Sequence, residues 1–255
     1  MAAPAIPTPT PQYSIVVPCF NEQDNIVPLV QEITDTVANQ QKFEIIVVDD
    51  CSTDESVRRL IELKNKLDFN LRILTHPVNA GQSAAVCTGA DAARGTWLIT
   101  LDGDGQNDPA DIPQLITELV HIQSDRPNDD AFPIICGYRK KRQDSWIKRY
   151  SSKFANAVRS RLLRDETPDT GCGLKLINRE AFLRLPRFDH MHRFLPALML
   201  REGARVVSIE VNHRARAAGE SKYGVHNRLW VGIVDIVGVI WLRRRKFKLM
   251  TYKEY

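Results

Sequence analysis

The chain has 255 residues, enough to bury a sizeable core in one large domain, and 43% of them are hydrophobic and 26% charged, as in ordinary globular proteins. Its 35 Lys and Arg against 31 Asp and Glu leave a net charge of +4, too mild to indicate nucleic-acid binding. Its five cysteines have no C-x-x-C spacing, so they indicate neither a disulfide framework nor a zinc site and fit a reducing cytosol.

The first twelve residues are rich in Pro, Thr and Ala, without the basic and apolar regions of a signal peptide. We expect residues 1–12 to form a disordered tail. No apolar run in the sequence reaches the ~20 residues that a membrane-spanning helix needs.

From Tyr13 onward, short β-branched apolar segments alternate with amphipathic segments. We expect strands at 13–18, 44–49, 71–75, 96–101 and 134–137, and helices at 25–40, 55–66, 82–93 and 109–122. This alternation predicts an α/β fold, with an open, mostly parallel, twisted sheet flanked by helices on both faces.

Polar clusters follow four of these strands, at 18–22, 49–54, 79–82 and 102–106. In open parallel sheets, ligands bind outside the carboxyl ends of the strands. We therefore expect one ligand to contact all four clusters.

The last cluster, Asp102-Gly-Asp104-Gly-Gln106, alternates oxygen-bearing side chains with glycines. In an extended segment these three side chains point the same way, and Mg²⁺ and Mn²⁺ prefer oxygen ligands. We expect Asp102, Asp104 and Gln106 to hold such a cation; the alternative is a plain acidic surface turn.

Acidic residues after the first two strands suggest a nucleoside pocket. Glu22, Asp49 and Asp50 can accept hydrogen bonds from ribose hydroxyls and base N–H groups, while the metal holds a diphosphate that departs. Alternatively, Asp49 and Asp50 are helix caps. The G-x-G-x-x-G and P-loop fingerprints are absent from the sequence.

The second half of the chain is less regular. We expect a basic helix at 146–163, a tight turn at 169–173, strands at 174–177 and 206–211, helices at 179–185 and 191–201, and a loop at 214–223. The segment 229–242 is apolar apart from Asp235 and is followed by Arg243-Arg244-Arg245-Lys246-Phe247-Lys248.

Taken together, these motifs resemble family-two glycosyltransferases of the GT-A fold, and most of all the dolichol-phosphate mannosyltransferase-like, polyprenyl-phosphate sugar transferases. The matching segments are 16–22, 47–54, 79–81, 102–106, 137–139, 146–152, 169–173 and 219–222. They occur in order from residue 13 to about residue 224. Gly105 departs from the family pattern, which often has a larger apolar residue there.

The resemblance implies roles for particular residues. Pro18, Phe20, Glu22 and Asp50 would line the nucleoside site, and Asp102, Asp104 and Gln106 would hold Mg²⁺ or Mn²⁺. Arg139 and Arg149 would bind the acceptor phosphate, and Arg216, Ser221 and Lys222 would lie on a loop over donor and acceptor. The implied activity is inverting transfer of a sugar from a nucleotide-diphosphate donor to a polyprenyl phosphate, feeding cell-envelope glycan or lipopolysaccharide assembly.

The basic residues support a phosphate acceptor independently. A sugar hydroxyl needs a general base, for which Asp169 is the nearest candidate, whereas a phosphate is already a nucleophilic dianion near neutral pH. The run from Arg139 to Arg164 supplies the cations that bind phosphate. Two alternatives stay open: transfer to a sugar hydroxyl of a glycan or glycolipid, and a non-catalytic nucleotide-sugar-binding scaffold.

Three regions are expected along the chain: the tail at 1–12, a glycosyltransferase domain at 13–224 and an amphipathic segment at 225–255. The last segment would bind either the membrane surface or a partner, such as an integral-membrane protein. Alternatively, residues 229–242 form a buried core helix. We expect a peripheral protein on the cytoplasmic face of the membrane, without a nucleic-acid partner.

Overall fold

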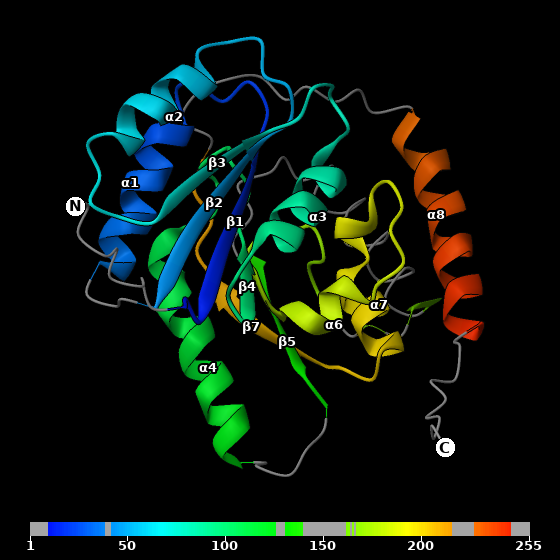
Figure 1. Cartoon of the computed structure of the whole chain (residues 1–255). Coiled ribbons are helices and arrows are strands. Elements are labelled where there is room, and N and C mark those ends of the chain that lie inside the picture. Colours follow the sequence, from blue (N-terminus) through cyan, green and yellow to red (C-terminus); the bar gives the residue numbers. More distant parts are fainter. Residues whose placement is uncertain are drawn as a thin grey trace, which may run out of the picture.

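A computed structural model of the chain describes residues 10–38, 42–125, 131–139, 162–163, 165, 167–215 and 227–245. Seven strands form one sheet in the order β3-β2-β1-β4-β6-β5-β7 (Figure 1). Their bounds are β1 Tyr13–Cys19, β2 Phe43–Asp49, β3 Leu71–Thr75, β4 Trp97–Thr100, β5 Pro133–Arg139, β6 Lys175–Asn178 and β7 Arg205–Val211. The predicted open α/β sheet is confirmed, with strand ends shifted by one or two residues.

One strand runs against the others. β6 pairs antiparallel with both β4 and β5, whereas β1, β2, β3 and β4 pair in parallel, as do β5 and β7. Because Thr100 lies opposite Lys175, the amino end of β6 reaches the edge at which β4 ends. The turn before β6 therefore joins the loops that follow the parallel strands.

Helices cover both faces of the sheet (Figure 1). On one face, the core contains side chains of α1 (Ile26–Val37), α2 (Ser56–Lys64) and α4 (Ile112–Asp125). On the other face, it contains side chains of α3 (Gln82–Ala92), α6 (Arg179–Leu183), α7 (Leu195–Arg201) and α8 (Asn227–Arg244). Every residue of β1 and β2 is buried, as expected for strands covered on both sides.

Two of the expected helices begin with a short 3₁₀ turn. The segment expected at 109–122 starts as η1 (Pro109–Asp111), capped by the Asp108 carboxylate, and continues as α4. Likewise, η2 (Met191–Arg193) precedes α7. The expected basic helix at 146–163 lies outside the described residues except for 162 and 163.

At the edge opposite the strand carboxyl ends, the fully buried Glu44 carboxylate of β2 is hydrogen-bonded to three other segments. Glu44 accepts hydrogen bonds from Ser14 Oγ at 2.6 Å, from the Arg94 backbone N–H at 2.7 Å and from Arg72 Nη1 at 3.0 Å. These bonds connect β1, β2, β3 and the turn between α3 and β4.

The last helix, α8, has one buried and one exposed side. Val239 is 1% exposed and, with Ile236 and Ile240, packs in the core, and Arg201 Nε of α7 donates to the Leu242 carbonyl at 3.0 Å. The core-helix alternative is therefore correct for this face. Among the described residues, no helix is both long enough and apolar enough to span a membrane.

Candidate active site

Hydrogen bonds join the first two loops at the carboxyl edge of the sheet. The Asn21 N–H donates to Ser52 Oγ at 2.8 Å, and Asn21 Oδ1 accepts from the Thr53 N–H at 2.7 Å. The Gln23 N–H donates to Asp54 Oδ2 at 3.1 Å. These bonds fix the β1–α1 and β2–α2 loops against each other.

The third loop is bound to the second through Asp50. The Asp50 carboxylate accepts from the backbone N–H groups of Ala80 at 2.9 Å and Gly81 at 2.7 Å, and its Oδ1 lies 2.7 Å from His76 Nδ1. Asp50 is only 3% exposed. In this arrangement, its carboxylate holds the loop that begins α3.

The neighbouring Asp49 is 2% exposed, and its Oδ2 accepts from the Ser52 N–H at 3.0 Å. Its other oxygen, Oδ1, is buried without a hydrogen-bond partner among the described residues. Both aspartates thus lie at the carboxyl edge of the sheet, where they were expected. Their contacts with a nucleoside stay a prediction.

The other residues predicted to line the nucleoside site lie at the end of β1 and in the loop that follows it. Pro18 is in β1, opposite Val48, and Phe20 is half-buried just beyond the strand. Glu22 is half-buried and accepts from Asn25 Nδ2 at 2.7 Å.

The segment after β4 turns, rather than extending as expected. Gly105 has φ of +73°, and the Gln106 N–H donates back to Asp104 Oδ1 at 3.1 Å. The alternation argument for a shared direction of Asp102, Asp104 and Gln106 is therefore wrong, because a turn replaces the extended backbone. The turn nevertheless keeps all three residues within one short loop at the carboxyl edge.

Within this loop, the Asp102 side chain is enclosed by contacts from two other segments. Its Oδ1 accepts from Gln82 Nε2 at 2.7 Å, and a Cβ at Gly173 would lie only 2.4 Å from its carboxyl carbon. Burial raises the pKa of Asp102 to about 6, the nearby Asp104 carboxylate adds to the rise, and Lys175 and Arg139 oppose it. The carboxyl group is thus held from two sides, next to a second negative charge.

The chemistry of this loop fits a hard divalent cation. The Asp104 carboxylate raises the pKa of Asp102, so a cation near both groups would stabilise the ionised form of Asp102. A carboxamide oxygen is a further ligand of the kind that such cations prefer. Among the described residues, no group of three or more His, Cys, Asp or Glu side chains could hold a metal, so the candidate set depends on Gln106 as well.

Arg139 is paired with Asp169. Its Nε and Nη2 donate to the two carboxylate oxygens at 2.6 and 3.0 Å, and both side chains are nearly buried, at 11% and 7% exposed. The ion pair lies beside the turn that carries Gly171 and Gly173. The Arg139 guanidinium occupies both carboxylate oxygens of Asp169, which disfavours this residue as the general base considered above.

Four other predicted site residues, Arg149, Arg216, Ser221 and Lys222, lie outside the described residues. Sequence reasoning, in turn, missed the supporting contacts of Gln82, His76 and Gly173. Gln82 belongs to the third polar cluster, which was its only signal. Gly173 belongs to the predicted turn at 169–173, but its contact with Asp102 was not predicted, and His76 gave no signal, because both contacts depend on segments distant in sequence.

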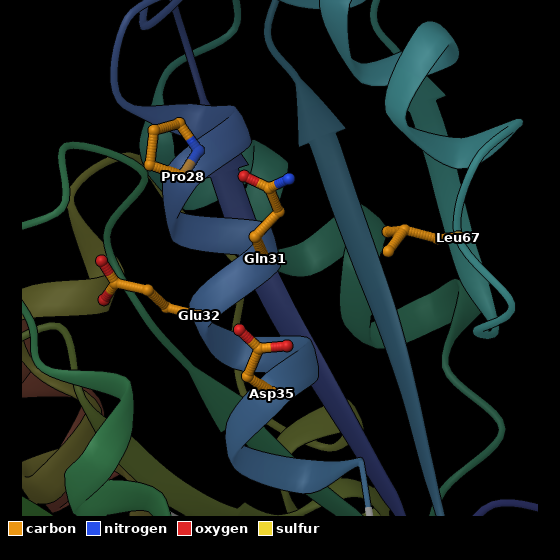
Figure 2. A pocket seen from close by; sticks show the side chains of 5 residues that line it. All are labelled: Pro28, Gln31, Glu32, Asp35 and Leu67. Carbon is orange, nitrogen blue, oxygen red and sulfur yellow. The ribbon is translucent and has the colours of Figure 1, made fainter.

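A hollow of about 490 Å³ lies elsewhere, on the outer side of α1 (Figure 2). Pro28, Gln31, Glu32 and Asp35 of α1 line it, with Leu67 from the segment after α2. None of the predicted site residues lines this hollow.

A mostly parallel sheet with joined loops at its carboxyl edge and an acidic turn after its fourth strand fits a glycosyltransferase of the GT-A fold. The family model of glycosyl transferase family 2 matches residues 14–185, and the chain belongs to this family.

Two characterised relatives cover most of the chain. A dodecaprenyl-phosphate galacturonate synthase of Rhizobium johnstonii is 34% identical over 94% of this chain and 70% of that protein. An undecaprenyl-phosphate 4-deoxy-4-formamido-L-arabinose transferase of Proteus mirabilis is 31% identical over 82% of this chain and 62% of that protein.

Solved structures share the fold. Glucosyl-3-phosphoglycerate synthase of Mycobacterium tuberculosis, crystallised with Mn²⁺, uridine-diphosphate-glucose and glycerol 3-phosphate, superposes with a TM-score of 0.64 at 18% identity, over 91% of this chain and 80% of that chain. A second structure of that enzyme, with Mg²⁺ and uridine diphosphate, gives a TM-score of 0.64 at 17% identity, over 91% of this chain and 79% of that chain.

Proposed function

We propose that this glycosyltransferase moves a sugar from a nucleotide-diphosphate donor to a polyprenyl phosphate, in the assembly of cell-envelope glycans or lipopolysaccharide. The observation that carries the proposal is the Arg139–Asp169 ion pair. It occupies the candidate general base and places a guanidinium beside Asp102, which suits an acceptor that is already an anion. The names of both relatives point to the same class of acceptor.

The reaction is a direct displacement. An acceptor phosphate oxygen forms a bond to the anomeric carbon from the face opposite the nucleotide, while the bond from that carbon to the diphosphate oxygen breaks. The electron pair leaves with the nucleoside diphosphate, and the anomeric configuration inverts. No proton has to be removed from the dianionic form of the acceptor.

Asp102, Asp104 and Gln106 would hold a divalent cation, Mg²⁺ or Mn²⁺. When bound, this cation supplies Lewis-acid stabilisation of the charge that develops on the departing diphosphate. The two structures of glucosyl-3-phosphoglycerate synthase, which shares the fold, contain Mn²⁺ or Mg²⁺, which supports a divalent metal here.

The remaining residues would bind the substrates. Pro18, Phe20, Glu22, Asp49 and Asp50 form the wall proposed for the nucleoside. Arg139 would contact the acceptor phosphate through its guanidinium, oriented by Asp169. Arg149, Arg216, Ser221 and Lys222 share this role in the proposal.

We further propose that the enzyme is peripheral, on the cytoplasmic face of the membrane, with α8 lying at the surface. Val234, Val237 and Trp241 are 67%, 61% and 59% exposed and recur at helical spacing, and Arg244 and Arg245 follow them on the exposed end. Trp favours the membrane interface, and basic clusters are attracted to anionic head groups. In Figure 1, the start of α8 lies toward the edge that carries the site loops, which suits an acceptor whose phosphate lies at the membrane surface.

The test is an incubation of the purified protein with Mn²⁺ or Mg²⁺, a short polyprenyl phosphate and a panel of nucleotide sugars, followed by mass spectrometry of the lipid. The matched control acceptor is the same polyprenol without phosphate. We expect a lipid-phosphate sugar from at least one donor and none from the polyprenol. Transfer to a glycolipid hydroxyl, with none to polyprenyl phosphate, would overturn the proposal in favour of a sugar-hydroxyl acceptor.

A further inference from the structure

A seam of hydrogen bonds joins the candidate metal loop to the segment after β7. Asn107 and His213 form an isolated antiparallel bridge, and the Arg214 N–H donates to the Gln106 carbonyl at 3.0 Å. The Asn212 N–H donates to Asp111 Oδ2 at 2.7 Å. Residues 212–214 therefore lie along residues 106–111, although some hundred positions separate them in sequence.

Asn107 carries this seam into the loop. Its backbone takes part in the bridge with His213, while its Oδ1 accepts from the Asp102 N–H at 3.0 Å. Asn107 is 2% exposed, so it has little freedom to move. The position of residues 212–214 is thereby coupled to the backbone of both Asp102 and Gln106.

The Arg214 side chain adds two ion pairs to this seam. Its Nη2 donates to Asp108 Oδ1 at 2.6 Å, and its Nη1 is paired with Glu32 of α1. Asp108 Oδ1 also caps η1 by accepting from the Ala110 N–H at 3.0 Å. One guanidinium thus links α1, the start of η1 and the loop that carries Gln106.

We propose that Arg214 is a positioning residue for the divalent cation of this glycosyltransferase. It acts through Asp108 and through its own backbone bond to Gln106, and it fixes the loop in the arrangement that binds the ion. The planar guanidinium suits this role because it donates to two carboxylates in fixed directions, which a lysine ammonium cannot reproduce. This inference rests on the metal site proposed above.

The test measures ion binding without turnover. Mn²⁺ is titrated into the full-length protein, with the nucleoside diphosphate that binds best to the wild type, and free Mn²⁺ is followed by electron paramagnetic resonance. Residues that support metal ligands affect affinity by about 10- to 100-fold, so Arg214→Gln should raise the dissociation constant at least tenfold. Arg214→Lys, which retains the charge, should give an intermediate value and serves if Arg214→Gln folds poorly.

Arg187→Gln is the matched control. Like Arg214, Arg187 donates two hydrogen bonds to carboxylate oxygens, in its case both of Asp91, and it is similarly exposed, at 46% against 40% for Arg214. This control should bind Mn²⁺ as the wild type does. A double-mutant cycle with Asp108→Asn identifies the route: if Arg214 acts through Asp108, the two substitutions together should cost clearly less than the product of their separate effects.

Three outcomes would count against the inference. Wild-type affinity in Arg214→Gln would show that the seam does not position the ion, and an equal loss in Arg187→Gln would show a general effect of removing a surface ion pair. Independent effects in the cycle would remove Asp108 from the route. If the wild type and Asp104→Asn both fail to bind Mn²⁺, the proposed metal site itself is wrong, which is a distinguishable result.

Discussion

Gly173 lies where a side chain would collide with the candidate metal loop. A Cβ there would be 2.4 Å from the Asp102 carboxyl carbon, whereas a Cβ at Gly171, in the same turn, would meet Arg139 at 3.4 Å. We expect Gly173→Ala to displace Asp102 and to reduce sugar transfer by more than about tenfold, since ligand placement controls metal affinity. Gly171→Ala is the control and should retain most activity; similar losses in both variants in a transfer assay would contradict the prediction.

His192 gives the fold a sensitivity to acid. Its Nδ1 lies 2.8 Å from Ser83 Oγ, and burial, with the charges of Arg193, Lys175 and His190, lowers its pKa from 6.5 to about 3. Between these values, the unfolded chain binds a proton that the folded chain does not. The free energy of unfolding should therefore fall as the pH drops below 6.5, by up to about 1.4 kcal/mol per pH unit.

The measurement is urea unfolding of the wild type and of His192→Asn at pH 7 and at pH 5. The substitution removes the titrating group and keeps a polar side chain beside Ser83, so the variant should lose less stability between the two pH values. Equal losses in both proteins would show that His192 does not contribute.

At the scale of elements, we predict that the buried Glu44 contributes to stability by joining the strands at one edge of the sheet. Glu44→Gln places an amide against three donors and leaves Arg72 without its carboxylate partner, and breaking a buried charged pair costs about 3 kcal/mol or more. The control, Glu62→Gln, removes an exposed pair with Arg58 and should change the stability little, because exposed ion pairs are screened by solvent. Chemical denaturation gives both values, and a similar cost for both would refute the special role of Glu44.

The alternation of strands and helices was predictable because each element has a hydrophobic pattern that is visible in its own residues. The β-branched run of β1 and the spaced apolar residues of α1 are visible within a dozen residues. The reversed direction of β6 was not predictable, because four residues fit either orientation and only pairing with β4 and β5 selects one.

The site was predictable only to the level of its loops. The sequence places Asp50 and Asp102 after strands, yet Asp50 is held by His76 and by the loop at residue 80, and Asp102 by Gln82 and Gly173. Each of these contacts joins segments that are at least twenty positions apart. Such contacts follow from packing of the whole sheet, which no local pattern contains.

For the whole molecule, the proposed contact with the membrane is assigned to the exposed side of α8. Replacing Val237 and Trp241 by Glu alters only exposed side chains, so it should spare folding and abolish flotation with anionic liposomes. Val120→Glu on α4, where Val120 is 53% exposed, is the control and should float as the wild type does. If the wild type does not float at low salt, or the α8 variant still does, the outer side of α8 is not a membrane surface.

The two sides of the seam, residues 106–111 and residues 212–214, are synthesised at different times during translation. Asn212 and Asp111 are 101 positions apart, so a ribosome adding about 5 to 20 residues per second makes the second half of the seam about 5 to 20 s after the first. During that interval the nascent chain carries Asp102, Asp104 and Gln106 without residues 212–214, which lie along their loop in the folded protein. The loop that carries the proposed metal ligands is therefore completed late in translation, after the last strand of the sheet, β7, has been made.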